Sequence, residues 1–325
     1  METNKKPYVI GIDVGGTNTA FGIVDARGNI LASSKETVKT QKHQDVNKYI
    51  DELYDELSKL IKESCGIERI QGIGVGAPNA NYYSGQIEYA ANLPWKGIIP
   101  LSKILTDKFG VPTALTNDAN AAAIGEMTYG VARGMKNFIM ITLGTGVGSG
   151  IVANGQLIYG HDSFAGELGH VIVRRENGRP CGCGNSGCLE TYTSATGVAN
   201  TAREFLAKRA NETSLLRKIP AEQITSLNVT EAAFAGDQIA QDVYTFTGQI
   251  LGEAFADFVK FSSPEAIILF GGLAKAGDLL LVPICKAMEQ NLLINHKGKI
   301  KILFSEMKDA DAAILGASAL GWEAK

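Results

Sequence analysis

A strand, glycine-turn, strand pattern occurs twice in this chain, and this repeat constrains the fold more than any other feature. The first copy spans residues 8–33 and the second spans residues 138–159. Each copy crosses a glycine-rich turn, at residues 15–16 or 144–148, and continues through two further β-rich runs. The repeat predicts two related α/β halves. Chance similarity is the alternative, because Asn-Gly turns and Gly-Ile-Val runs are common in strands.

Helical periodicity after the first copy extends this prediction. Apolar residues recur at helical spacing over residues 44–64, and a β-rich run follows at 70–76. A chain of 325 residues is also long for one hydrophobic core. We therefore predict a two-domain α/β protein with duplicated β-β-β-α-β-α halves. The predicted small lobe comprises residues 1–117 with 310–325, and the large lobe, which holds the cysteine cluster described below, comprises 118–309.

Composition excludes several classes of partner. Hydrophobic residues make up 45% of the chain and charged residues 20%, and the formal net charge is −3. The chain therefore has no strongly basic field to attract nucleic acid or an anionic membrane surface. The apolar run at residues 8–12 ends at Asp13, too early for a signal peptide or a membrane helix. We expect a cytoplasmic protein whose partners are small molecules.

A compact set of metal-binding side chains lies in the second half of the chain. His170, Cys181, Cys183 and Cys188 follow the spacing His-x10-Cys-x-Cys-x4-Cys. Three thiolates and one imidazole suit tetrahedral zinc, and four protein ligands would close the site to substrate water, so such a zinc is structural. A disulfide is the weaker interpretation, because cysteines separated by one residue rarely reach bridge geometry and three cysteines leave one over.

Both glycine turns carry groups that bind phosphate. Glycines let backbone amides approach phosphate oxygens, and Thr17 adds a hydroxyl group. Asp13, at the end of the first predicted strand, can hold a hydrated magnesium ion. Taken alone, Asp-x-Gly-Gly indicates only a turn, but together with the second glycine turn it favours binding of a nucleotide triphosphate.

An Asn117-Asp118 pair lies where the predicted strand at 112–116 turns into a helix. Asp118 is a good candidate for the helix N-cap, which is a purely structural role. Its carboxylate could instead accept a proton from a hydroxyl group as that hydroxyl attacks a γ-phosphate, with Asn117 holding a neighbouring hydroxyl. The local pattern alone is compatible with both roles.

Two further carboxylates flank the cysteine cluster. Glu167 precedes His170, and Glu190 follows Cys188. A carboxylate that contacts several vicinal hydroxyl groups is a recurrent means of binding a sugar. The alternative is that both acids orient the metal ligands.

Five ordered motifs resemble those of the ROK family of bacterial sugar kinases and repressors, and the resemblance covers residues 8–322. The motifs are Asp-x-Gly-Gly-Thr-Asn from Asp13, Asn-Asp-Ala-Asn-Ala-Ala-x-x-Gly-Glu from Asn117, Leu-Gly-Thr-Gly-x-Gly-x-Gly from Leu143, Gly-Glu-Leu-Gly-His from Gly166, and Cys-x-Cys-Gly-x-x-Gly-Cys-Leu-Glu from Cys181. The resemblance implies a two-domain actin-like ATPase (ribonuclease H-like) fold with an interdomain cleft that closes on ATP and a hexose.

The resemblance also implies roles for individual residues. Asp118 would be the catalytic general base. The implied contacts to the sugar are Asn92, Asn117, Asp118, Glu167, His170 and Glu190. The implied ATP-binding residues are Asp13, Gly15, Gly16, Thr17, Asn18, Gly144, Thr145, Gly146, Gly271 and Gly272. The implied zinc ligands are His170, Cys181, Cys183 and Cys188.

One departure from the family pattern concerns the loop after Pro78. Family members commonly continue Gly-x-Pro with a glycine and a β-branched residue, whereas Asn79-Ala-Asn81 follows here. That loop lies near the sugar in relatives. We therefore expect Asn79 or Asn81 to influence which sugar is bound.

These features together predict a kinase that uses ATP and Mg²⁺ to phosphorylate glucose at its 6-hydroxyl group, with a structural zinc ion. A kinase for an N-acetylated hexosamine would keep every motif and is the first alternative. A sugar-sensing repressor is the second, but it would carry a DNA-binding domain ahead of Tyr8, and only seven residues precede Tyr8. The resemblance also implies a homodimer or a dimer of dimers.

Overall fold

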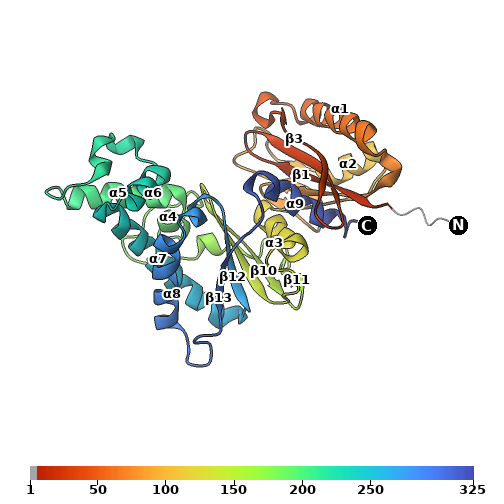
Figure 1. The fold of residues 1–325 in the computed structure, drawn as a ribbon. Helices are drawn as coiled ribbons and strands as arrows, with labels where there is room; N and C mark the ends of the chain where they lie inside the picture. The colour runs from red at the N-terminus through yellow and green to blue at the C-terminus, as the bar shows by residue number, and fades with distance from the viewer. Residues whose placement is uncertain (1–5) are drawn as a thin grey trace. The chain divides into compact units, whose positions relative to one another are not determined.

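The computed structural model describes residues 6–325, apart from the side chains of residues 35–37, 309 and 310. The chain forms two compact units (Figure 1). The first unit comprises the chain up to Met135 together with Leu157–Ala165 and Glu306–Lys325. The second unit comprises Lys136–Gln156 and Gly166–Ser305.

The first unit is built on a five-stranded sheet of order β3-β2-β1-β4-β8, beside which β5, β6 and β7 form a small second sheet. The pairs β1/β2 and β2/β3 are antiparallel, whereas β4 is parallel to both β1 and β8. The elements of this unit are β1 (Tyr8–Val14), β2 (Thr19–Asp25), β3 (Ile30–Val38), α1 (Val46–Ser64), β4 (Ile70–Gly76), β5 (Ala80–Asn81), β6 (Gln86–Glu88), β7 (Ile98–Ile99), α2 (Leu101–Phe109), β8 (Thr113–Thr116), α3 (Asp118–Tyr129) and α9 (Asp309–Gly321).

The second unit repeats this sheet, with strand order β11-β10-β9-β12-β13. Here β9 and β10 are antiparallel, whereas β12 is parallel to both β9 and β13. The elements are β9 (Phe138–Leu143), β10 (Val147–Ala153), β11 (Gln156–Leu157), α4 (Glu190–Thr193), α5 (Ala195–Lys208), α6 (Ser226–Phe234), α7 (Gln238–Ser262), β12 (Ala266–Phe270), α8 (Asp278–Asn291) and β13 (Lys301–Phe304). The predicted duplicated α/β fold is confirmed.

Local sequence explains the long helix α1. Its buried residues recur at helical spacing along one face, and they are Tyr49, Ile50, Leu53, Leu57 and Ile61. The Asp45 side chain accepts a hydrogen bond from the Asn47 N–H and caps the first turn. The helix predicted from the apolar spacing is therefore present.

Close helix packing holds the C-terminal helix α9 in the first unit. A Cβ at Gly74 of β4 would collide with the Ala317 carbonyl oxygen of α9. A Cβ at Gly125 of α3 would lie 2.7 Å from the Gly316 Cα of α9. These glycines let α9 lie against both the sheet and α3. The sequence placed the domain boundary after residue 117, whereas the structure keeps α3 in the first unit because α3 packs on α9 in this way.

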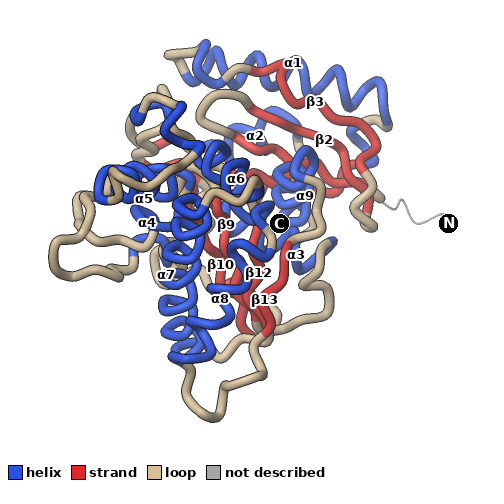
Figure 2. The backbone as a smooth tube through the Cα atoms, turned by 60° about the vertical axis from the view of Figure 1, so that its left-hand side comes forward, coloured by secondary structure: helices blue, strands red, loops and turns tan. Residues whose placement is uncertain are grey.

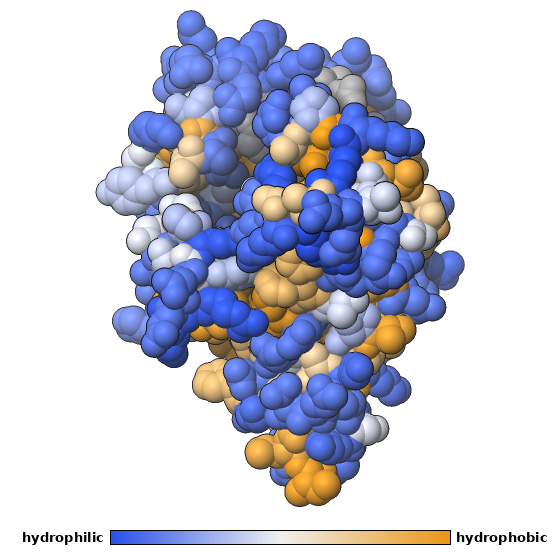
Figure 3. All heavy atoms as spheres, turned by 90° about the vertical axis from the view of Figure 1, so that its left-hand side faces the viewer, coloured by the Kyte–Doolittle hydropathy of each residue, from blue (hydrophilic) through white to orange (hydrophobic). Residues whose placement is uncertain are grey.

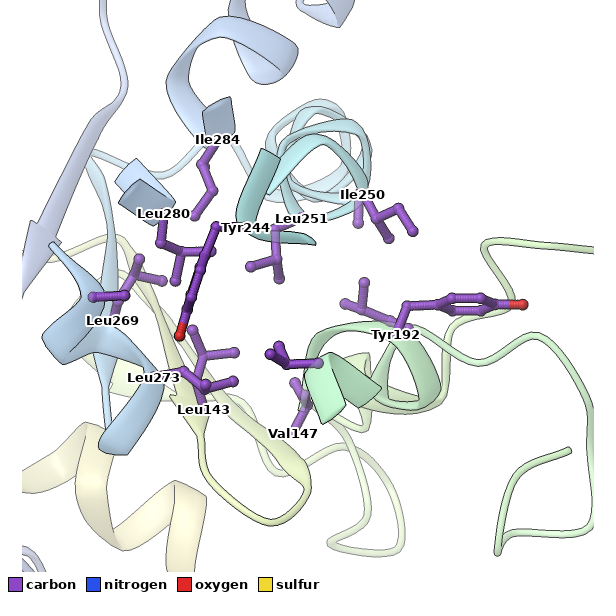
Figure 4. Close-up of a cluster of buried hydrophobic side chains, with 14 of the residues drawn as sticks. Leu143, Val147, Tyr192, Tyr244, Ile250, Leu251, Leu269, Leu273, Leu280 and Ile284 are labelled. Carbon is purple, nitrogen blue, oxygen red and sulfur yellow. The ribbon is translucent and has the colours of Figure 1, made fainter. Parts of the chain in front are cut away.

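The core of the second unit lies between its sheet and its helices. Side chains from β9, β10 and β12 meet those of α7 and α8, as Leu143, Val147, Leu269, Leu251 and Ile284 show in Figure 4. Helices α7 and α8 lie side by side in Figures 1 and 2. Among residues 6–325, no helix is both long and apolar enough to cross a lipid bilayer.

Candidate active site and metal centre

Two acidic residues, Asp13 and Asp118, lie close together at the carboxyl ends of the parallel strands in the first unit. Asp13 of β1 pairs with Gly76 of β4, and Gly76 pairs with Thr116 of β8. A Cβ at Gly76 would lie 3.8 Å from Asp13 Oδ1 and 3.9 Å from the Cα of Asp118. The small residue at the end of β4 therefore leaves the space in which Asp13 and Asp118 approach each other.

The environment of this pair favours a proton or a cation. The pKa of Asp13 is raised to about 7, chiefly because the carboxyl group is buried and secondly because the charge of Asp118 lies nearby. A negative charge on Asp13 is therefore unfavourable unless a positive charge compensates for it. A hydrated Mg²⁺ ion bound with a nucleotide is one group that would supply the compensation.

The cap of helix α3 is Asn117, not Asp118. Asn117 Oδ1 accepts a hydrogen bond of 2.7 Å from the Asn120 N–H. Asp118 is the first helical residue, and its Oδ1 accepts a bond of 2.9 Å from the Ala119 N–H. The structural role that the sequence allowed for Asp118 is thus filled by its neighbour. Asn117 still has its side-chain NH2 group to offer to a substrate hydroxyl.

The first glycine turn is held together by residues distant in sequence. The Gly15 N–H donates to the Asn18 carbonyl at 3.0 Å. A Cβ at Gly16 would lie 3.1 Å from the Asn92 carbonyl oxygen, so Asn92 lies against the turn. Gln41 Nε2 donates to the Gly16 carbonyl at 2.6 Å. Sequence analysis missed Gln41, because a lone glutamine in a polar segment after β3 carries no local signal.

The second glycine turn lies beside a glycine pair that follows β12. Phe270 of β12 pairs with Thr142 of β9, so both strands end at the same edge of the sheet. Gly271 has φ +104°, and a Cβ there would lie 2.6 Å from the Leu143 carbonyl oxygen. Only glycine fits this close approach. The structure therefore brings Gly271 and Gly272 next to the turn that begins at Gly144.

The four predicted zinc ligands converge. One ligand atom from each of His170, Cys181, Cys183 and Cys188 lies within 4.8 Å of all the others. Cys183 Sγ and Cys188 Sγ are 3.7 Å apart, and Cys181 Sγ is 3.6 Å from His170 Nδ1. Tetrahedral zinc with ordinary bond lengths requires separations of about 3.8 Å between two sulfurs and about 3.6 Å between sulfur and nitrogen. The donor set and its spacing fit zinc.

His170 and Glu167 lie at the edge of this cluster. The His170 Nδ1 atom faces Cys181, while its Nε2 atom is 4.0 Å from a carboxylate oxygen of Glu167. A metal bound at Nδ1 would leave the proton on Nε2, which could then donate to a sugar hydroxyl or to Glu167. These two side chains come from the short 3₁₀ helix at Leu168–His170 and the residue before it.

Arg179 anchors the cysteine segment to α4 and α5, and sequence analysis did not single it out. Its Nε donates to a Glu204 carboxylate oxygen at 2.9 Å, and its Nη1 donates to the Thr191 carbonyl at 2.9 Å. Its guanidinium also lies over the Tyr192 ring, 4.6 Å from the centroid. One arginine next to a cluster of cysteines is too common to be recognised as an anchor without the fold.

A cavity of about 470 Å³ opens in the second unit between the glycine turn, the cysteine segment and α5. Its walls include Thr145, Cys181, Glu190, Thr196 and Asn200. Residues predicted to bind phosphate, metal and sugar therefore line the same cavity.

The asparagines of the unusual loop after Pro78 are occupied by internal contacts. Asn81 is nearly buried, and its Nδ2 donates to the Asp162 carbonyl at 3.1 Å. Its Oδ1 accepts from the Tyr83 N–H at 3.0 Å. Asn79 has φ +51° and donates from Nδ2 to the Glu88 carbonyl at 3.1 Å. These side chains therefore fix the shape of the loop, and their influence on which sugar is bound stays a prediction.

In the first unit, the structure gathers the predicted residues at one edge of the sheet. They are Asp13, Gly15, Gly16, Thr17, Asn18, Asn92, Asn117 and Asp118. In the second unit it gathers a second set around the end of β9 and the cysteine segment. They are Gly144, Thr145, Gly146, Glu167, His170, Cys181, Cys183, Cys188, Glu190, Gly271 and Gly272.

The repeated sheets and the glycine turns at their edges define a protein of the actin-like ATPase fold. The chain belongs to the ROK family, whose sequence model matches residues 9–324.

Known relatives of this chain include both enzymes and regulators. It is 36% identical over 320 residues to a glucokinase of Halalkalibacterium halodurans, which covers 98% of this chain and 95% of that protein. It is 29% identical to a xylose repressor of Caldicellulosiruptor bescii, over 96% of this chain and 77% of the repressor. A solved ROK family glucokinase from Streptomyces griseus, in complex with glucose and AMPPNP, has a TM-score of 0.79 and 30% identity, covering 97% of this chain and 99% of that chain.

Proposed function

We propose that this chain catalyses the ATP-dependent phosphorylation of glucose at its 6-hydroxyl group. The observation that carries the proposal is the position of Asp118, which lies beside Asp13 at the end of the parallel strands while Asn117 caps the helix. The choice of sugar is supported by 36% identity to a glucokinase over 98% of the chain. It is also supported by the similar glucokinase structure that contains glucose and AMPPNP.

In the proposed reaction, Asp118 acts as general base. Its carboxylate accepts the proton of the 6-hydroxyl group as that oxygen attacks the γ-phosphorus in line, and the bond from the γ-phosphorus to the leaving ADP oxygen breaks. Asp13 would hold the hydrated Mg²⁺ that accompanies ATP. Burial and the charge of Asp118 raise the pKa of Asp13, and the positive charge of a bound Mg²⁺ would oppose both, so binding of Mg-ATP favours the ionised form of Asp13.

The remaining predicted residues bind and orient the two substrates. Backbone amides of the two glycine turns, with the hydroxyl groups of Thr17 and Thr145, contact the phosphates, and Gly271-Gly272 lies against the adenosine. The proposed sugar contacts are Asn92, Asn117, Asp118, Glu167, His170 and Glu190. Because phosphoryl transfer depends chiefly on positioning and charge neutralisation, these contacts matter as much as the base.

We assign a structural zinc ion to His170, Cys181, Cys183 and Cys188. Four protein ligands leave no open position for a substrate, so the ion supplies no Lewis-acid step. The ion would instead fix the positions of its four ligands, and it would leave His170 Nε2 directed away from the cluster.

The test is release of ADP with glucose, N-acetylglucosamine, N-acetylmannosamine, mannose and fructose as acceptors. We expect kcat/KM for glucose to exceed that for each other sugar by at least about tenfold, which is about 1.4 kcal/mol in transition-state binding. A preference for an N-acetylated sugar would instead identify the chain as a kinase for an N-acetylated hexosamine. Sugar binding without any ADP release would favour a sensor like the repressor relatives.

A homodimer, or a dimer of dimers, is the proposed assembly. The face drawn in Figure 3 is mostly hydrophilic, with hydrophobic side chains exposed in small groups. Exposed apolar side chains of the second unit include Phe234, Phe261 and Ile294, with 64%, 87% and 86% of their surface accessible. Such groups are candidates for burial between subunits. Light scattering after gel filtration would give the mass. We place the protein in the reducing cytoplasm, which suits a chain with five cysteines of which we assign three to zinc.

A further inference from the structure

We propose that Glu190 is a positioning residue that ties the second glycine turn to the metal cluster, so that the cluster controls nucleotide binding as well as sugar binding. The proposal rests on the proposed function for the identity of the nucleotide. The sequence predicted that Glu190 contacts the sugar or orients a metal ligand, but a carboxylate has two oxygens. The structure assigns one of them to the turn.

The contact between Glu190 and the turn is direct. The Val147 N–H donates to Glu190 Oε2 at 2.8 Å. A Cβ at Gly146 would lie 2.5 Å from the same oxygen, so the absence of a side chain there admits the carboxylate. Glu190 Oε1 is left for a substrate hydroxyl. A carboxylate that accepts from a backbone amide makes a stronger bond than a neutral acceptor does.

The segment that follows Glu190 binds the other arm of the turn. The Ala195 N–H donates to the Gly144 carbonyl at 2.8 Å, and Thr196 Oγ1 donates to the Thr145 carbonyl at 3.5 Å. Helix α4 and the start of α5 therefore contact both sides of the turn. The conformation of the phosphate-binding amides depends on where this segment is held.

Two of the metal ligands hold that segment and the strand beside it. Cys188 is buried and lies two residues before Glu190, and the Leu189 N–H donates to the Val171 carbonyl at 2.9 Å, next to His170. A Cβ at Gly169 would collide with the Val147 carbonyl oxygen, so the short helix that carries His170 packs directly on Val147. A metal ion that joins His170 to Cys188 would thus fix both neighbours of the Val147 peptide group.

Core packing makes this link stiff. Figure 4 shows the Leu143 and Val147 side chains, one on each side of the turn, directed into the cluster of apolar side chains of the second unit. Tyr192, two residues after Glu190, lies at the edge of that cluster. Because these side chains are closely packed, a displacement of Glu190 would also displace the turn.

The experiment measures nucleotide affinity in the absence of sugar. Binding of AMPPNP with Mg²⁺ is followed by calorimetry for the zinc-loaded wild-type chain and for Glu190→Ala and Glu190→Gln, and zinc content is measured in each. We expect Glu190→Ala to weaken AMPPNP binding about tenfold, or about 1.4 kcal/mol. Glu190→Gln should retain most of the affinity, because the amide oxygen still accepts from Val147. Hydrogen exchange at the Val147 amide should quicken in Glu190→Ala and not in Glu190→Gln.

Glu265→Ala is the matched control. Glu265 Oε1 accepts from the Lys136 and Asn137 N–H groups at 2.9 and 3.0 Å, next to the start of β9 and away from the turn at its other end. This variant loses the same kind of bond, and we expect its AMPPNP affinity to stay within twofold of wild type.

Metal removal by Cys183→Ser should reproduce both effects of Glu190→Ala. The inference would be overturned if Glu190→Ala and Cys183→Ser both bound AMPPNP within twofold of wild type and showed unchanged hydrogen exchange at the Val147 amide. A wild-type chain that binds no AMPPNP would overturn the proposed function, while the exchange rate of Val147 would still decide the role of Glu190.

Discussion

The two units of this protein have sheets of the same topology, but they differ in the side chains at the carboxyl ends of the parallel strands. In both, an antiparallel hairpin precedes parallel strands, with orders β3-β2-β1-β4-β8 and β11-β10-β9-β12-β13. The first unit places two acids, Asp13 and Asp118, at the carboxyl ends of its strands. Both units have a glycine turn at this edge, but in the second unit Glu190 ties the turn to a cluster of one histidine and three cysteines. The fold thus determines where chemistry can occur, and a few side chains decide which chemistry each unit performs.

Of the changes that test this difference between the units, removal of the proposed base in the first unit should have the largest effect. Asp118→Asn keeps the shape of the side chain but removes its basicity, and we expect kcat to fall at least about a thousandfold. Stability and zinc content should match wild type, because Asn117 caps the helix and the cluster lies in the second unit. Asp107→Asn, an exposed acid of the same unit, is the control. A kcat near that of wild type in Asp118→Asn would remove Asp118 from the role of base.

Loss of a metal ligand in the second unit should have the next largest effect. In Cys183→Ser we expect zinc content, measured by elemental analysis, to fall together with glucose affinity, which should weaken by about ten- to a hundredfold. Cys65→Ser changes a cysteine of the first unit that is outside the cluster, and should alter neither quantity. Unchanged glucose binding in the metal-free variant would show that the cluster and the sugar contacts are independent.

The smallest effect concerns how stability depends on pH in the first unit. The folded chain holds the pKa of Asp13 at about 7, above the ordinary value of 3.8. The folded state therefore binds the Asp13 proton more tightly than the unfolded state does, and the associated stability is lost as pH rises from about 4 to about 7. Asp13→Asn cannot titrate. In the absence of Mg²⁺, the wild-type chain should therefore lose stability relative to Asp13→Asn as pH rises over this range. We expect the difference between their free energies of unfolding to change by about 2 kcal/mol, after allowance for the partial exposure of the Asp13 side chain.

Urea denaturation at the two ends of that pH range measures this difference. Asp107→Asn again serves as the control, because the Asp107 side chain is exposed. A stability difference between Asp13→Asn and wild type that is the same at both pH values would mean that Asp13 ionises in the folded chain as an ordinary carboxyl group does.

Local patterns in the sequence were sufficient to predict the architecture. The two hairpins, the helix α1 and the glycine turns depend on residue spacing within short segments, and all of them are present. The four-residue metal set could also be predicted, because its spacing fits the coordination preferences of one ion. Strong local signals of this kind need no knowledge of distant contacts.

Features that depend on distant contacts could not be predicted. Gln41 binds Gly16 across 25 positions of sequence, and Glu190 binds Val147 across 43. The assignment of α3 to the first unit depends on how closely Gly125 can approach Gly316. The choice of Asn117 over Asp118 as the cap depends on one residue of helix register, which sequence patterns do not resolve.

The central claim is that this chain transfers the γ-phosphoryl group of ATP to the 6-hydroxyl group of glucose, and the product tests it most directly. Phosphorus NMR of wild-type protein incubated with glucose and Mg-ATP should show a new phosphomonoester whose phosphorus couples to the two protons of carbon 6, formed in step with ADP. Asp118→Asn should form none in the same time. A phosphorus coupled to a single ring proton, or consumption of ATP without a sugar ester, would contradict the account.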